Sequence, residues 1–378
     1  MRIGWCNRGY PNTRCILDKV PGAEYVHSRS YAAALARVAR MVRLPSKGIL
    51  KFGASFIGGT RSNKVDLYHF FNQVGVGLCD RPFVTTFETS LPRCLNIGDY
   101  WWSKSIEAMA SSRCKRLIAL SECACEIQMR TKGVPDVSDR LVVLHPPQEV
   151  LAGTEVLNRK QDRKEVLKFF FVGKDFYRKG GGESLRALAR IRKDYPVEVW
   201  AVGDFEHVDY ASSWAVDSRE ATARLIEENK DWIHYAHSLP NERVLELMKT
   251  CDVGLLPTRA DTYGYSVLEM QACGLPVITT DVRALPEINN DDCGWLIKGC
   301  GVRDGSVTFG EADYSTTGKM RELSGRIENG IYNACMEIAT KPDLVVEKGG
   351  RALAKIKKEH APSQYGTRLG KIYLEAMG

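Results

Sequence analysis

The sequence predicts an α/β protein of two domains, each a parallel β-sheet with helices on both faces. Short apolar runs alternate with segments of helical periodicity along the chain, which is typical of strands joined by crossover helices. The 378 residues are too many for one ordinary core and fit two domains. A polar, charged stretch at residues 158–164 is the best linker candidate.

The first half supplies five short apolar runs that we expect to be strands. They cover residues 3–6, 65–69, 83–87, 116–120 and 141–144. A second series follows the linker, with strands expected at residues 168–172, 197–202, 232–235, 253–256 and 277–280.

Helices are expected between the strands of the second series. One enters through glycines 180–182 and has Leu185, Leu188 and Ile191 on one face, a second covers residues 221–228, and a third starts at Pro240 with Val244, Leu247 and Met248 facing inward. Residues 299–318, rich in Gly, Ser, Thr and Asp, are expected to form a surface excursion. Two helical stretches then follow, the last at residues 365–377.

Composition and charge indicate where the protein is located and which kinds of partner it can bind. No run reaches the ~18 apolar residues of a membrane span, the start has no apolar signal core, and the twelve cysteines form no Cys-x-x-Cys pair. We therefore expect a reducing, cytoplasmic location. The formal charge of +7 suits a phosphorylated substrate, anionic lipid or nucleic acid, and nucleic acid is least favoured because no nucleic-acid module is visible.

Residues 258–287 are the most informative stretch. The strand expected at 253–256 ends at Pro257, a loop carries Asp261, and Gly264 opens a helix that presents Glu269. Ligands of open α/β sheets bind at the carboxyl ends of strands, so this loop is a candidate binding site.

The helix that begins here suits a phosphate between two carboxylates. The free amides of Tyr265, Ser266 and Val267 would point at an anion, helped by the helix dipole. Carboxylates on either side can accept hydroxyl hydrogen bonds, which suggests a sugar joined to a phosphate. The alternative is that Asp261 and Glu269 are helix-capping and surface acids, although Glu269 lies past the first turn.

This stretch closely resembles the donor-binding signature of retaining GT-B glycosyltransferases of family 4, also called group 1. Their pattern is a Glu, seven residues and a second Glu; here Asp261 replaces the first and Glu269 is the second. The resemblance implies that Asp261 bonds hydroxyls of the donor sugar and Glu269 the ribose. It also implies the GT-B fold, two Rossmann-like domains with parallel sheets facing across a cleft.

A second element gathers cationic side chains where a strand enters a helix. Lys174, Arg178 and Lys179 precede Gly180-Gly181, at a helix N-terminus that already attracts anions. The element is similar to the family's Gly-Arg…Lys-Gly grip on the nucleotide diphosphate, with Lys174 at the Arg position and Lys179 at the Lys position. The alternative is a solvated basic turn.

The first domain offers weaker candidates. Glu88 follows the strand expected at 83–87, where family members often carry a His or sometimes an acid near the reacting centre. It either orients the acceptor hydroxyl or stabilises developing positive charge on the sugar, or it caps the next helix. The family's Gly-Gly pair after the first strand is absent, and Gly9 is expected to do part of its work at the diphosphate. Ser121-Glu122 matches a family Ser-Glu and is expected to cap a helix.

The resemblance implies a retaining hexosyltransferase acting in polysaccharide or glycolipid biosynthesis. It would use a UDP- or GDP-sugar donor and a saccharide or lipid-linked acceptor, with Glu88, Asp261 and Lys179 as catalytic residues. Residues 1–150, joined by the terminal helix 363–378, would bind the acceptor, and residues 151–362 the donor. No Asp-x-Asp triplet occurs, so we expect transfer without a metal or other cofactor.

Three alternatives stay open. Arg37, Arg40 and Arg43 on a helix at residues 31–44 either contact an anionic membrane from the cytoplasmic side or form a solvated face. A dinucleotide oxidoreductase is disfavoured because no Gly-x-Gly-x-x-Gly follows a predicted strand. A catalytically degenerate glycan- or nucleotide-binding protein on the same scaffold would also explain the changed residues Asp261 and Lys174.

Overall fold

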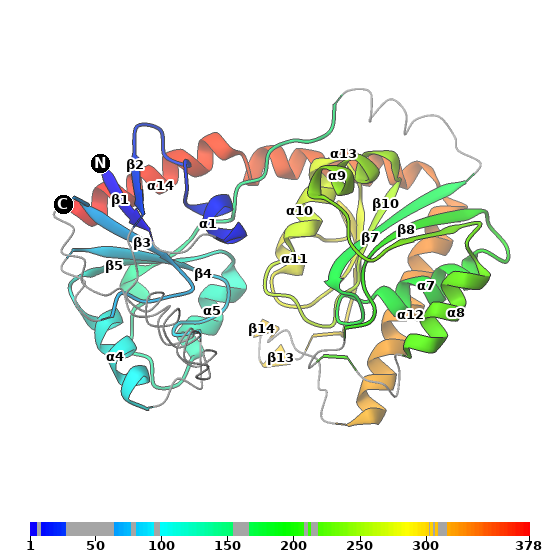
Figure 1. Ribbon diagram of the computed structural model, residues 1–378, viewed down its shortest axis with the longest axis horizontal. Coiled ribbons are helices and arrows are strands. Elements are labelled where there is room, and N and C mark those ends of the chain that lie inside the picture. Colours follow the sequence, from blue (N-terminus) through cyan, green and yellow to red (C-terminus); the bar gives the residue numbers. More distant parts are fainter. Residues whose placement is uncertain are drawn as a thin grey trace, which may run out of the picture. The chain divides into compact units, whose positions relative to one another are not determined.

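The computed structural model consists of two compact units, which we describe separately (Figure 1). It describes residues 1–5, 9–27, 64–76, 81–93, 99–153, 166–207, 211–212, 218–301, 303–304, 307–308 and 316–378. The first unit comprises Met1–Pro147 and His360–Gly378, and the second comprises Gln148–Glu359. The chain therefore changes unit a few residues before the boundaries expected after residues 150 and 362. The expected linker at 158–164 lies outside the described residues.

The first unit contains a six-stranded parallel sheet in the order β2-β1-β3-β4-β5-β6. Its strands are β1 (Arg2–Trp5), β2 (Glu24–His27), β3 (Leu67–Phe71), β4 (Phe83–Phe87), β5 (Cys114–Ala119) and β6 (Leu141–Val143). Strands β3 and β4 are buried along their whole length and occupy the centre. The edge strand β2 was not predicted, because its half-exposed residues form no apolar run.

The helices of the first unit include one from the C-terminus of the chain. They are α1 (Tyr10–Cys15), α4 (Asp99–Ala110), α5 (Glu122–Arg130), the 3₁₀ turn η1 (Ser138–Arg140) and α14 (Pro362–Met377). Helix α14 packs against β3, β4 and β5. The Tyr365 hydroxyl donates to the carbonyl of Cys15 at 2.6 Å, and Leu369 and Tyr373 are fully buried. The C-terminal helix thus completes the first unit.

The second unit contains a six-stranded parallel sheet in the order β12-β11-β10-β7-β8-β9. The strands are β7 (Leu167–Asp175), β8 (Val197–Asp204), β9 (Ile233–Ala236), β10 (Val253–Leu256), β11 (Val277–Thr280) and β12 (Gly294–Ile297). Numbered from β7, this is the doubly wound order 3-2-1-4-5-6, in which the direction of winding reverses between β7 and β10. The edge strand β12 was not predicted.

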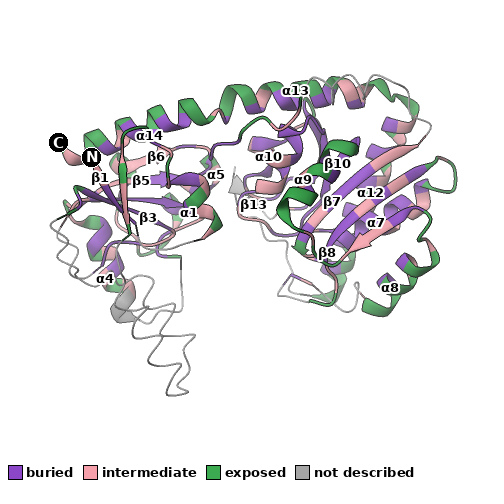
Figure 2. Cartoon of the chain, turned by 45° about the horizontal axis from the view of Figure 1, so that its top comes forward, coloured by how far each residue is buried: buried purple, intermediate pink, exposed green. Residues whose placement is uncertain are grey.

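Helices lie on both faces of the second sheet (Figure 1). They are α7 (Gly181–Ile191), α8 (Arg219–Glu228), α9 (Asn241–Thr250), α10 (Tyr265–Ala272), α11 (Leu285–Ile288), α12 (Thr317–Thr340) and α13 (Asp343–Glu359). The predicted inward residues of α7 and α9 are buried, as Figure 2 shows for these elements. Three long helices, α12, α13 and α14, follow residue 316 where we expected two.

The excursion predicted at residues 299–318 is described only in part. Its described residues include a small antiparallel pair, β13 (Arg303–Asp304) with β14 (Val307–Thr308). Across the described residues, no helix is both long enough and apolar enough to cross a membrane.

Candidate functional site

The reversal of strand order places two predicted motifs at one edge of the second sheet. The segment from the end of β7 to α7 carries Lys174, Arg178 and Lys179, and the loop after β10 carries Asp261. Strands β7 and β10 are hydrogen-bonded neighbours and run parallel, so both loops leave the same edge of the sheet. Because winding reverses between them, this edge is the place where doubly wound sheets usually bind their ligands.

Lys179 and Asp261 meet at this edge of the sheet as an ion pair. The Lys179 Nζ donates to Asp261 Oδ2 at 2.5 Å, and the two side chains are only 15% and 13% exposed. Burial raises the pKa of Asp261, but the charge and hydrogen bond of Lys179, together with the charge of Arg178, outweigh it and hold that pKa below its usual value. Asp261 is therefore an ionised acceptor beside a fixed cation.

Arg178 joins the two loops instead of lying open to a ligand. Its guanidinium contacts the carboxylate of Asp175 and donates through Nη1 to the carbonyl of Ala260 at 2.9 Å. Its own carbonyl accepts from the amide of Arg259 at 2.8 Å and from the Thr258 hydroxyl at 3.0 Å. The predicted donor-binding residue Arg178 thus sets the spacing of the loops, whereas Lys174 is exposed at the end of β7.

Two glycines allow the loops to turn into helices at this edge. Gly180 precedes α7 with φ = 82°, and a Cβ there would overlap the carbonyl oxygen of Pro257. Gly264 precedes α10 with φ = 98°, and a Cβ there would lie 2.6 Å from Leu285 Cδ2. Both positions favour glycine for conformation and for space. Two helix N-termini, with their partial positive charge, consequently begin beside the Lys179–Asp261 pair.

The first turn of α10 corrects one expectation. Tyr265 and Ser266 are half-buried at its start, but the amide of Val267 donates to the carbonyl of Gly264 at 2.9 Å. The carbonyl of Gly264 closes the first turn, so the Val267 amide is used within the helix and is not free for an anion. Glu269 lies half-buried further along the same helix.

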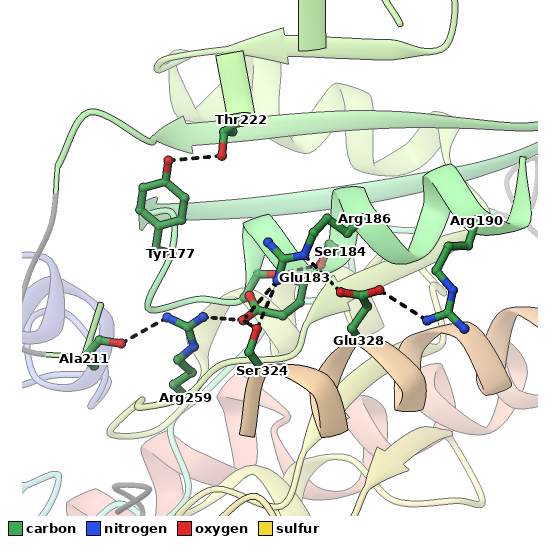
Figure 3. Close-up of polar contacts among 11 residues, drawn as sticks. Tyr177, Glu183, Ser184, Arg186, Arg190, Ala211, Thr222, Arg259, Ser324 and Glu328 are labelled. Atoms are coloured by element: carbon green, nitrogen blue, oxygen red, sulfur yellow. Dashed lines mark hydrogen bonds and ion pairs between the residues drawn. The ribbon is translucent and has the colours of Figure 1, made fainter. Parts of the chain in front are cut away.

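A fully buried ion pair beside these loops was not predicted. Arg259 Nη2 donates to Glu183 Oε1, and neither side chain is exposed (Figure 3). Burial raises the pKa of Glu183, but the charge of Arg259 and then that of Arg186 outweigh it and lower that pKa overall. Arginine is rarely buried without a partner, and this partner lies 76 residues earlier, so neither residue signals the pair in the sequence.

In the first unit, Glu88 is held by its neighbours. Its Oε2 accepts from Asn72 Nδ2 at 3.1 Å and pairs with Arg93 Nη1 at 2.5 Å, and the side chain is buried. Its amide donates back to Asn72 Oδ1 at 3.1 Å. Glu88 thus bonds to the end of the neighbouring strand β3, and its predicted role toward an acceptor stays a prediction.

The remaining first-unit candidates differ in what the structure describes. Gly9 precedes α1 with an extended φ of −153°, which does not require glycine, and residues 6–8 lie outside the described residues. Ser121 caps α5 by accepting from the amide of Ala124 at 3.0 Å, which confirms the predicted cap. The basic helix predicted at residues 31–44, with Arg37, Arg40 and Arg43, also lies outside the described residues. Among the residues that the structure describes, no cluster of three or more His, Cys, Asp or Glu is placed to hold a metal ion.

The match to a known sequence family falls in the second unit. Residues 154–304 match the family model described as glycosyl transferases group 1. The phosphatidyl-myo-inositol mannosyltransferase of Propionibacterium freudenreichii is 24% identical over 238 residues, which is 61% of this chain and 56% of that protein. A glycogen synthase of Mycobacterium tuberculosis is 25% identical over 129 residues, or 34% of this chain and 29% of that protein. The chain thus covers only part of these relatives.

Solved structures resemble the chain over nearly its whole length. Anabaena Alr3699/HepE in complex with UDP and glucose superposes with a TM-score of 0.63 at 13% identity, covering 99% of both chains. WaaG, a glycosyltransferase involved in lipopolysaccharide biosynthesis, superposes with a TM-score of 0.57 at 16% identity, covering 98% of this chain and 99% of that one. The chain therefore has the predicted GT-B fold, and residues 154–304, which carry the Lys179–Asp261 pair, match the group 1 glycosyltransferases.

Proposed function

We propose that the chain is a retaining glycosyltransferase of family 4 that transfers a hexosyl group from a UDP- or GDP-sugar. The acceptor is a saccharide or lipid-linked saccharide, in polysaccharide or glycolipid biosynthesis. The observation that carries the proposal is the Lys179–Asp261 ion pair between two helix N-termini at the switch point of the second sheet. The names of the relatives and the UDP held by a similar structure support the same substrate class.

The ion pair suits a donor in which a diphosphate joins a sugar. A lysine ammonium has three N–H donors, so Lys179 can keep its bond to Asp261 while it donates to a phosphate oxygen. The positive ends of α7 and α10 add to that attraction. Asp261, ionised and acceptor-only, receives hydroxyl hydrogen bonds from the sugar, and Glu269 receives those of the ribose.

The proposed chemistry needs positioning and charge neutralisation more than a protein nucleophile. The bond between the anomeric carbon and the diphosphate oxygen breaks while the acceptor oxygen bonds to that carbon on the same face. The acceptor proton passes to the departing diphosphate. Lys179 stabilises the negative charge that develops on the leaving group. Glu88 is proposed to orient the acceptor hydroxyl or to stabilise the positive charge that develops on the sugar. No metal takes part in the proposal.

The first test removes the cation. Lys179→Ala is expected to weaken UDP or GDP binding by about 10- to 100-fold, the equivalent of one charged hydrogen bond of ~1.5–3 kcal/mol. Calorimetry measures this directly. Lys168→Ala is the matched control, since Lys168 lies at the opposite end of β7 and its Nζ is 3.4 Å from a Glu198 carboxylate oxygen. Equal affinity of the Lys179 variant and the wild type would remove Lys179 from the site.

The second test separates sugar contact from nucleotide contact. Asp261→Asn is expected to lower kcat more than it raises KM, because the sugar contact matters most in the transition state. Glu269→Gln is expected to weaken binding of the free nucleoside diphosphate as well as the donor. Asp261→Glu restores the family residue and is tolerated if the clamp is an ordinary one. Full turnover and affinity in both Asp261→Asn and Glu269→Gln would refute the donor clamp.

A catalytically degenerate binder remains the alternative to an enzyme. Wild-type protein incubated with a panel of UDP- and GDP-sugars should release nucleoside diphosphate slowly without acceptor. Binding without release, with or without saccharide acceptors, would favour the degenerate protein.

Contact of residues 37–51 with anionic membrane stays a prediction. Its test is co-sedimentation with anionic vesicles at low salt and its loss on charge reversal of Arg37, Arg40 and Arg43.

A further inference from the structure

The buried Glu183–Arg259 pair connects the two segments that carry the proposed donor site. Glu183 lies in the first turn of α7, directly after the Lys179 segment, and Arg259 lies two positions before Asp261. Both side chains are completely buried, and their bond joins the N-terminus of α7 to the loop after β10. Each member of the buried pair therefore lies within a few residues, in sequence, of one member of the Lys179–Asp261 pair.

Other segments of the second unit converge on the same pair (Figure 3). Ser324 of α12 donates through Oγ to Glu183 Oε1 at 2.7 Å, and Arg186 Nη2 donates to Ser324 Oγ at 3.0 Å. Arg259 Nη1 donates to the carbonyl of Ala211, in the segment that follows β8, at 3.2 Å. A carboxylate and a guanidinium thus fix the relative positions of α7, α12 and two loops.

Stability alone does not account for this pair. Removing two charges from water costs about as much as their attraction returns, and apolar residues of similar volume commonly hold the same elements as well or better. An ion pair differs from apolar packing because the planar guanidinium donates its hydrogen bonds only in fixed directions. The Glu183–Arg259 bond therefore orients the loop that carries Arg259, and the backbone of this loop is also held by the bond from Arg259 N to the Arg178 carbonyl.

We propose that Glu183 and Arg259 are positioning residues that hold the loop of residues 258–261 so that the Asp261 carboxylate faces Lys179. This inference rests on the proposed function, since it assigns the pair the task of placing the sugar contact relative to the diphosphate contact. The pair itself acts through Asp261 and not on the donor.

The decisive variant removes both charges together. Glu183→Gln with Arg259→Met leaves no unpaired buried charge, so the protein is expected to fold with a melting temperature close to that of the wild type. Because a small misplacement of a catalytic group is costly, kcat is expected to fall by about 10- to 100-fold. Affinity for UDP or GDP is expected to change less than about 3-fold, because Lys179 and the helix N-termini remain. If the ion pair served only to fill space, the double variant would keep the wild-type kcat as well as the wild-type affinity.

Hydrogen exchange supplies a readout that does not depend on activity. In the double variant, amides of residues 258–264 should exchange faster, while those of β11, in the same unit, should keep their protection. If neither UDP- nor GDP-sugars bind to wild-type protein, the proposed function fails, but faster exchange at 258–264 would still support the positioning role. Wild-type exchange in this loop together with wild-type kcat would overturn the inference.

A matched control lies on the same helix pair. Arg190 of α7 donates to Glu328 of α12 at 3.2 Å, and Arg190 is 40% exposed. Arg190→Met removes this ion pair between α7 and α12 without touching the loop of Asp261, and leaves Glu328 bonded to Arg186 Nε at 3.0 Å. Wild-type kcat and exchange at 258–264 are expected. A fall in kcat equal to that of the Glu183 and Arg259 double variant would show that any damage to this helix pair suffices, and would overturn the specific role.

Discussion

Each unit buries a titratable side chain and bonds it to a helix from late in the chain, but the two units differ in charge. In the second unit the buried group is the Glu183–Arg259 ion pair, bonded to Ser324 of α12. In the first unit it is His69, whose Nε2 lies 2.7 Å from Thr86 Oγ1 and whose Nδ1 lies 2.7 Å from Tyr373 Oη of α14.

The difference follows from the partners available. Burial lowers the pKa of His69 to about 3, and both of its partners are uncharged hydroxyls that suit a neutral imidazole. Glu183 has a guanidinium partner and stays ionised. The second unit thus buries fixed charges next to a site proposed for a charged diphosphate. In the first unit, the buried contact between His69 and α14 is a neutral hydrogen bond, and the ion pair between β5 and α14, Arg116–Glu375, is partly exposed.

The largest expected effect is the loss of stability when only one member of the Glu183–Arg259 pair is replaced. Arg259→Met alone leaves the Glu183 carboxylate buried without its main cation, and should destabilise the second unit by ~3–5 kcal/mol. Urea denaturation measures the loss. Adding Glu183→Gln should recover most of it, and a single variant as stable as the double one would contradict the assigned charge states.

The next effect distinguishes the units by pH. The unfolded imidazole has a pKa near 6.5 and the folded one about 3, so unfolding takes up a proton between these values, and stability falls as pH falls. Between pH 7 and pH 5 the loss from His69 should be about 2 kcal/mol. Wild-type protein should therefore lose about that much more than His69→Asn in urea denaturations at the two pH values.

The buried acids of the second unit set the contrast. Glu183 and Asp261 have pKa values lowered in the folded state, so their contribution is complete above the unfolded carboxyl pKa of about 4 and is lost only below it. Neither should add to the slope between pH 7 and pH 5. Equal slopes for wild type and His69→Asn would show that His69 is not buried as a neutral group.

The smallest expected effect compares two helix caps. Ser121, nearly fully buried, caps α5 in the first unit, and Ser218, half-buried, caps α8 in the second, accepting from Ala221 at 3.2 Å. Ser121→Ala should cost about 1–2 kcal/mol and Ser218→Ala about 0.5–1 kcal/mol, because water can replace the exposed cap more easily. Thermal melts of the two variants test the order, which reversed values would contradict.

The sequence predicted the bounds of strands best where proline or glycine residues flank the strand. Strands β10 and β11 begin and end where expected, since Pro257 stops one and Gly274 to Pro276 precede the other. Strand β7 runs on to Asp175, beyond the predicted end, with an irregular pairing to β8 after Val172. The edge strand β2 was missed because edge residues need not be apolar.

The site was predictable where topology alone decides proximity. Lys179 and Asp261 follow neighbouring parallel strands, so the motif and the fold together place them at one edge. Arg259 and Glu183 meet only because side chains from separate segments pack together, and no local pattern encodes that. The Val267 amide was assigned wrongly because it bonds to the Gly264 carbonyl, and the sequence pattern does not show which first-turn amides are used within the helix.

The return of the C-terminal helix to the first unit has a consequence for biosynthesis. The second unit is one continuous stretch, Gln148–Glu359, whereas the first is interrupted by it and finished by His360–Gly378. As the ribosome advances, the second unit is available to fold before α14 has been made. The first sheet meanwhile lacks Tyr373, the partner of His69, and the helix that covers β3, β4 and β5. The half of the protein that is translated first is therefore the half that matures last.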